Sequence, residues 1–141
     1  MSVIEGARQV GGLGLGMPKP ARALYDFAVD GGAVSTITLR GDRIPAGAAI
    51  VDALLNVDTA LTGGTVTDTL ALGSEGAADI AAASARNAAP WSAAGAKRVT
   101  LTGGTAPVKT TVIRALTFTI AATVLTAGKF TLIVWYVELA P

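Results

Sequence analysis

The chain has 141 residues, a formal net charge of +1, and neither cysteine nor histidine. This length suits one domain with a real core. The charge gives no electrostatic reason to expect nucleic acid as a partner. Without cysteine and histidine, Ser–His and Cys–His catalysis, histidine-bound zinc and disulfides are excluded. The longest strongly apolar run, residues 130–137, is far too short for a membrane-spanning helix, so no membrane partner is expected.

A glycine-rich stretch, GGLGLGMPKP, occupies residues 11–20. A phosphate-binding loop would need a strand before it and a helix after it, and the sequence predicts neither. We instead expect an extended N-terminal arm over residues 1–20, because glycines allow close backbone approach and Pro18 and Pro20 keep the exit extended. The arm could lie on a partner surface, or along its own or a sister subunit. Its candidate contact residues with the partner are Arg8, Leu13, Leu15, Met17 and Lys19.

Short strands are predicted in the remaining residues, 21–141, beginning with a hairpin. Residues 21–29 and 33–40 are strand-like and flank Asp30-Gly31-Gly32, which is a turn sequence. A second turn is predicted at residues 43–47, RIPAG, where proline precedes glycine.

Residues 51–61, VDALLNVDTAL, show a period-two pattern typical of a half-buried strand. The pattern predicts one inward face that carries Val51, Ala53, Leu55, Val57 and Leu61. Residues 65–72 show a similar alternation that is interrupted by Asp68. In residues 116–120, LTFTI, alternation places Leu116, Phe118 and Ile120 on one face.

Residues 76–96, GAADIAAASARNAAPWSAAGA, are rich in alanine, which would suit a helix. Pro90 and Gly95 favour a long loop instead, with a short strand near Ile80. Trp91 has two interpretations, a plug at the end of the core and an anchor for a protein contact. The core plug is the favoured one.

The last predicted strand, residues 129–139, is apolar on both faces. Such a strand is usually buried on both faces, and in a sandwich only one of them meets the core. The other face could be covered by the chain's own loops or by a neighbouring subunit. Ile133, Trp135 and Val137 lie on that second face and are therefore candidate subunit-interface residues. A charged fraction of only 15% also favours assembly.

The sequence contains no recognisable catalytic arrangement. Asp26, Asp52 and Asp58 lie in predicted strands, and solvated aspartates that discourage edge pairing explain them better than a glycosidase pair. We therefore expect a non-enzymatic protein with no catalytic residue, no metal and no cofactor. Taken together, seven to nine short strands predict an all-β fold, an antiparallel β-sandwich or jelly roll, as one domain over residues 21–141.

Three segments of the chain carry a resemblance to a known class of protein. They are residues 24–57 (LYDFAVDGGAVSTITLRGDRIPAGAAIVDALLNV), 89–95 (APWSAAG) and 114–137 (RALTFTIAATVLTAGKFTLIVWYV). In pattern and composition the chain resembles small virion structural proteins of tailed bacteriophages, especially capsid decoration and head-fibre-type proteins. The resemblance implies a jelly-roll or sandwich domain that assembles, often as a trimer, and holds the shell through terminal arms and base loops.

The resemblance further implies a partner and a location. The partner would be the major capsid protein, and the protein would lie on the capsid surface of the virion after a period in the host cytoplasm during assembly. A tail, baseplate or head-fibre component of the virion is the alternative. A carbohydrate-binding β-sandwich module is a third possibility, and the scarcity of aromatic residues weighs against it.

Overall fold

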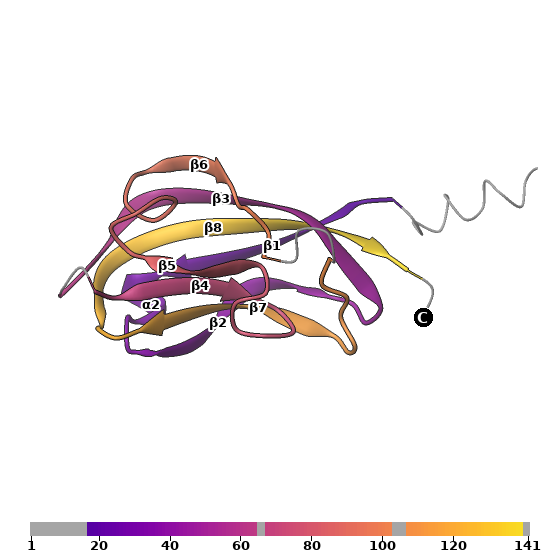
Figure 1. Cartoon of the computed structure of the whole chain (residues 1–141), viewed down its shortest axis with the longest axis horizontal. Helices are drawn as coiled ribbons and strands as arrows, with labels where there is room; N and C mark the ends of the chain where they lie inside the picture. Colours follow the sequence, from indigo (N-terminus) through magenta and orange to yellow (C-terminus); the bar gives the residue numbers. More distant parts are fainter. Residues whose placement is uncertain (1–16, 65–66, 103–106, 140–141) are drawn as a thin grey trace, which may run out of the picture.

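The computed structural model describes residues 17–64, 67–102 and 107–139 (Figure 1). The described elements are β1 (Lys19–Asp26), α2 (Phe27–Asp30), β2 (Ser35–Ile44), β3 (Ala48–Gly63), β4 (Thr69–Gly73), β5 (Ala81–Ala85), β6 (Gly95–Arg98), β7 (Arg114–Ala121) and β8 (Leu125–Glu138). All strand pairs are antiparallel, and together they form one curled sheet in the order β5-β4-β7-β2-β1-β8-β3-β6. The predicted all-β antiparallel fold is confirmed. No helix in the described ranges is long and apolar enough to cross a membrane.

The sheet folds over on itself at β2. Residues 35–38 and 43–44 of β2 pair with β7, whereas Arg40 and Gly41, between them, pair with β1. Gly41 has φ of 142°, and a Cβ there would lie 2.2 Å from the carbonyl oxygen of Arg22. Glycine therefore permits the close approach of β1 and β2. The two halves of the sheet, β5-β4-β7-β2 and β1-β8-β3-β6, face each other across the core.

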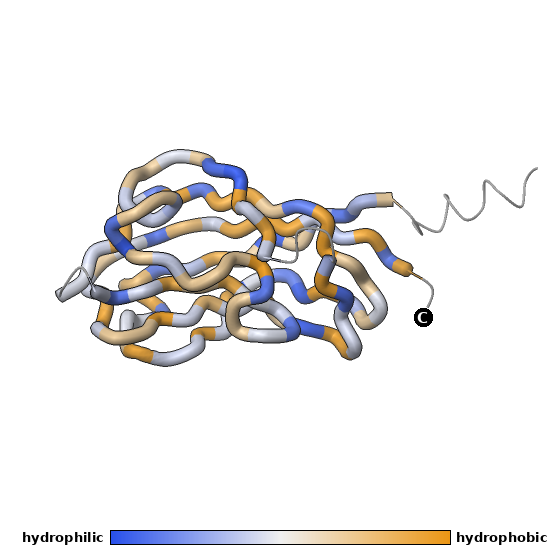
Figure 2. The backbone as a smooth tube through the Cα atoms, in the orientation of Figure 1, coloured by the Kyte–Doolittle hydropathy of each residue, from blue (hydrophilic) through white to orange (hydrophobic). Residues whose placement is uncertain are grey.

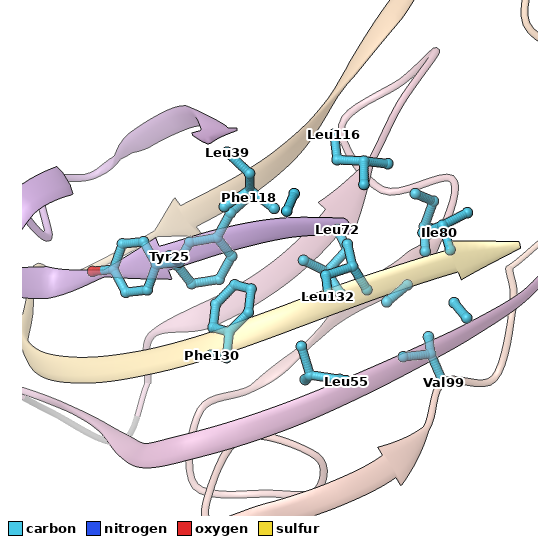
Figure 3. Close-up of a cluster of buried hydrophobic side chains, with 14 of the residues drawn as sticks. Tyr25, Leu39, Leu55, Leu72, Ile80, Val99, Leu116, Phe118, Phe130 and Leu132 are labelled. Carbon is cyan, nitrogen blue, oxygen red and sulfur yellow. The ribbon is translucent and has the colours of Figure 1, made fainter. Parts of the chain in front are cut away.

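Aromatic side chains from both halves meet at the centre of this core (Figure 3). The ring of Phe118 on β7 lies 4.8 Å from that of Tyr25 and 5.0 Å from that of Phe130, centroid to centroid. Trp91 is fully buried, and its ring centroid lies 5.8 Å from that of Phe118. Its Nε1 donates a hydrogen bond of 2.8 Å to Ser84 Oγ, which satisfies the one polar atom of the side chain. Trp91 thus plugs the core.

The alternating patterns predict most of the buried faces. Leu116, Phe118 and Ile120 of β7 are buried, as are Ala53, Leu55, Val57 and Leu61 of β3. The prediction for Val51 is wrong, because this side chain is 43% exposed. The register of β3 against β8 shifts between Ile50 and Asp52. The resulting bulge turns Val51 outward, and Ile50 takes the buried position.

The predicted hairpin over residues 21–40 is wrong in its connection but right in its pairing. Asp26 accepts a hydrogen bond of 3.0 Å from the backbone N–H of Ala28 and caps one turn of helix, α2, which Gly31 ends with φ of 77°. β1 and β2 still pair antiparallel. The turn after β2 lies at residues 45–47, within the predicted RIPAG segment.

The alanine-rich segment over residues 76–96 contains no helix. It holds β5, a loop and the start of β6, in agreement with the predicted loop and short strand near Ile80. β5 and β6 are the two edge strands of the sheet.

Candidate assembly surface

The structure describes two of the five predicted arm-contact residues. Arg8, Leu13 and Leu15 lie outside the described residues. Met17 is 54% exposed. Lys19 is the first residue of β1, pairs with Tyr136 and donates a hydrogen bond to Glu138 Oε2, and this bond raises the pKa of its ammonium group. The sheet therefore begins two residues before the predicted domain boundary, and Lys19 has an intramolecular partner.

The three predicted subunit-interface residues, Ile133, Trp135 and Val137, are all half-buried on one face of β8. The side chains that alternate with them, Leu132 and Val134, are buried in the core. The other half of the sheet covers that inner face, and no further strand or helix of the described ranges is left to cover the outer one. Among the described residues, no second layer of strands or helices therefore covers the outer face of β8.

Residues of β1 and β3 extend this outer face into a continuous apolar area. In register, Ile133 lies between Arg22 and Leu54, and Trp135 lies between Pro20 and Asp52. Val51, turned outward by the bulge, is next to Asp52. We call this area the outer patch, made of Pro20, Val51, Leu54, Ile133, Trp135 and Val137.

An ion pair borders the outer patch beside Trp135. Arg98 of β6 lies with Nη2 2.6 Å from Asp52 Oδ2, and the hydrogen bond from Arg98 lowers the pKa of Asp52. Asp52 is thus a paired carboxylate on a strand face. Asp58 accepts a hydrogen bond of 3.1 Å from Asn56 Nδ2. Both aspartates therefore have local hydrogen-bond partners on the sheet.

The start of β1 and the end of β8 lie at one end of the domain, which we call the arm end. Hydrogen bonds there join the end of β8 to two other segments. The buried Thr110 donates from its hydroxyl to Pro45 O at 2.6 Å, and its carbonyl accepts from the backbone N–H of Gly47 at 2.8 Å. Gly47 O in turn accepts from the backbone N–H of Leu139 at 3.0 Å. The turn between β2 and β3, the segment before β7 and the end of β8 therefore form one unit.

The arm end exposes large apolar side chains. Their exposed fractions are 54% for Met17, 51% for Val112, 61% for Ile113 and 42% for Leu139. The hydropathy colouring of the backbone in Figure 2 marks apolar residues at the end of β8. Since β1 and β8 also carry Pro20, Trp135 and Val137, the outer patch reaches this end of the domain.

Glu75 fixes the turn that presents Val112 and Ile113. Its carboxylate accepts hydrogen bonds from the backbone N–H of Thr111 at 2.9 Å and from its hydroxyl at 3.0 Å. It also accepts from Nε and Nη2 of Arg114 at 2.5 and 3.2 Å. The Arg114 hydrogen bond, followed by that of the Thr111 N–H, lowers the pKa of Glu75 to about 2. This cluster was not predicted, because nothing in the local sequence pattern relates residue 75 to residues 111–114.

Replacing Glu75 by glutamine is expected to remove an acid-sensitive part of the stability. The pKa of Glu75 is depressed from 4.5 to about 2 in the folded chain, so its carboxylate stabilises the fold fully above pH 4.5 and progressively less as the pH falls through about 2. The melting temperature of the unaltered protein should exceed that of Glu75→Gln at about pH 6, and the difference should shrink below pH 4.5. Thermal unfolding followed by circular dichroism measures this, and a pH-independent difference would contradict it.

The described residues contain no group of three or more acidic side chains placed to hold a metal ion. An open groove of about 630 Å³ lies between β5 and the segment after β6. Its uncharged lining residues are Ala81, Ala82, Ser84, Ala89, Pro90, Val99, Thr100, Leu101 and Thr102. Its charged lining residues are Lys97 and Arg98. None of these described lining residues carries a carboxylate.

No protein-family model matches the chain, and no curated protein matches it in sequence. Its structure is similar to a chain in the capsid of Ralstonia phage GP4, with 25% sequence identity, a TM-score of 0.65, and coverage of 90% of this chain and 88% of that one. It is also similar to a chain in the capsid asymmetric unit of cyanophage Pam1, with 20% identity, a TM-score of 0.62 and coverage of 87% and 86%. A third similar chain is in the acidic stable capsid structure of Helicobacter pylori bacteriophage KHP30, with 16% identity, a TM-score of 0.56 and coverage of 84% and 86%. Each likeness spans nearly the whole of both chains, so the matched chains share this β fold and are of about the same length.

Proposed function

We propose that the chain is a non-enzymatic structural protein of a phage virion and that it binds the outer surface of the head as a decoration protein. The observation that carries this proposal is the set of similar structures. All three are chains of phage capsids, and the likeness extends over at least 84% of this chain in every case. The partner would be the major capsid protein.

The surfaces of the domain suit such a role. The arm end exposes apolar side chains and is the place where residues 1–16 join the sheet, so an arm and a rigid surface can bind one partner together. The outer patch provides a second apolar surface, bordered by the Asp52–Arg98 ion pair. We assign the outer patch to contacts between copies of this chain, arranged as a trimer, with Ile133, Trp135 and Val137 at the interface.

Binding to phage heads that lack the protein tests the proposed function. The full-length chain should bind such heads saturably, and electron cryo-microscopy should show its density on the outer surface of the shell. A chain that begins at Met17 should keep the thermal unfolding of the full-length protein, because β1 begins at Lys19, but should bind at least about tenfold more weakly.

Two outcomes would contradict this. A full-length protein that does not bind heads, or whose density lies on the tail, would refute the decoration role. Equal binding by the two chains, or unfolding of the shorter one, would refute the role of the arm alone.

A further inference from the structure

Both ends of the domain expose apolar side chains, so the fold by itself offers two candidate ends for docking. Opposite the arm end, the segment after α2 and the start of β8 are joined by the hydrogen bond from Leu125 N to Gly32 O. This far end exposes Val29 by 66%, Val34 by 50% and Val124 by 50%. Figure 1 shows α2 and the turn before β8 at one extreme of the molecule and the end of β8 at the other.

We infer that the turn at residues 111–113 is the docking element of the arm end, with Val112 and Ile113 inserted into an apolar depression of the shell protein. This inference rests on the proposed decoration function and adds to it the contact surface and the chemistry of the partner. Around the depression the shell protein would present carboxylates.

The first support is the rigidity of the turn. Four hydrogen bonds to Glu75 hold Thr111 and Arg114 on either side of the exposed pair. One residue earlier, Thr110 is only 1% exposed and is bonded through its backbone and its hydroxyl to the turn between β2 and β3. Val112 and Ile113 are therefore presented on a fixed scaffold, and a fixed loop loses little conformational entropy when it binds.

The second support is the position of the arm. Sixteen residues precede Met17, and they join the domain close to Lys19, which is bonded to Glu138. The next residue, Leu139, donates a backbone hydrogen bond to Gly47 in the turn at residues 45–47. The same turn is hydrogen-bonded to Thr110. A partner that holds the arm is thus brought near residues 111–113. The far end has no such connection to a chain terminus within the described ranges.

The third support is charge. Lys109 and Arg43 are exposed, and neither lies in an ion pair with a described carboxylate. Lys109, just before the turn at residues 111–113, forms an isolated antiparallel β-bridge with Ala49. Arg43 lies opposite Ala115, which is just after that turn. Lys19 and Arg114, at the same end, are already paired with acids. The two remaining cations flank the apolar pair, and carboxylates are the groups that complement them.

The experiment compares two double variants that are matched in chemistry and exposure. Val112→Asp/Ile113→Asp should bind phage heads that lack the protein at least about tenfold more weakly than the unaltered chain. Val29→Asp/Val34→Asp, which places the same charges at the far end, should bind as the unaltered chain does. Thermal unfolding checks that both variants are folded.

A charge reversal provides a second readout should the double variant not fold. Lys109→Glu should weaken binding several-fold at low salt, and the loss should diminish as salt is added. Lys129→Glu, at an exposed position near the far end, should have no effect. Normal binding by folded Val112→Asp/Ile113→Asp, or by Lys109→Glu if the double variant is unfolded, would overturn the inference and leave the decoration role standing. Failure of the unaltered chain to bind would overturn both.

Discussion

Replacing Asp68 by alanine is expected to lower the free energy of unfolding by about 3–5 kcal/mol. Asp68 is fully buried, and its Oδ2 lies 2.6 Å from Nε of Arg86, whose side chain is only 11% exposed. Removal of the carboxylate leaves the guanidinium group in a region of low dielectric constant without its counter-charge. The pair holds the connection between β3 and β4 against the loop that follows β5, so its loss also loosens that edge of the sheet.

The matched control is Asp52→Ala. It breaks the ion pair with Arg98, whose side chain is 78% exposed, and an exposed pair of this kind contributes at most about 1 kcal/mol. Urea unfolding, followed by circular dichroism at a protein concentration low enough to prevent association, compares the two variants. Equal losses of stability would show that burial does not distinguish the two pairs. Asp68→Leu/Arg86→Leu should recover part of the loss, because it leaves no charge buried.

Replacing Trp91 by alanine is expected to lower the free energy of unfolding by about 3–5 kcal/mol. The indole ring is fully buried against Phe118 and Phe130, so its removal creates a cavity between the two halves of the sheet. It also deprives Ser84 Oγ of its hydrogen-bond donor. Thermal or urea unfolding measures the loss.

Replacing the other tryptophan, Trp135, should affect association between copies more than stability. Trp135 is half-buried on the outer patch, so Trp135→Ala should change the stability of the single copy little but should reduce association between copies. Sedimentation velocity compares the variants with the unaltered protein. If Trp135→Ala associates as the unaltered protein does, the outer patch is not the subunit interface. If Trp91→Ala is as stable as the unaltered protein, the role of Trp91 in the core is contradicted.

The inner faces of the sheet were predictable wherever one strict alternation governs a whole strand. In β7 the alternation alone identifies the buried Leu116, Phe118 and Ile120 correctly. Val51 follows the same alternation and is nevertheless exposed, because the bulge at Ile50 depends on how β3 pairs with β8. Pairing between strands distant in the sequence is not encoded in the local pattern of either one.

The hydrogen bonds and ion pairs of Asp68 and Glu75 were not predictable either, because their partners are also distant in the sequence. Asp68 interrupts an alternating run, and nothing nearby in the sequence indicates that it is buried with Arg86, 18 residues away. The partners of Glu75 are 36 and 39 residues distant. The exposure of Ile113 was missed because an apolar residue gives no sign in the sequence of whether it enters the core or the solvent.

The central position of β1 has a consequence for the order in which the protein forms. β1 lies between β2 and β8, and the Lys19–Glu138 hydrogen bond joins positions 119 residues apart in the chain. A growing polypeptide therefore leaves the ribosome with its first strand unmatched on one side until β8 has been synthesised, and such distant pairings close slowly. Until then neither the outer patch nor the arm end has its full set of strands. A partly synthesised chain thus lacks the complete surfaces on which the proposed contacts depend.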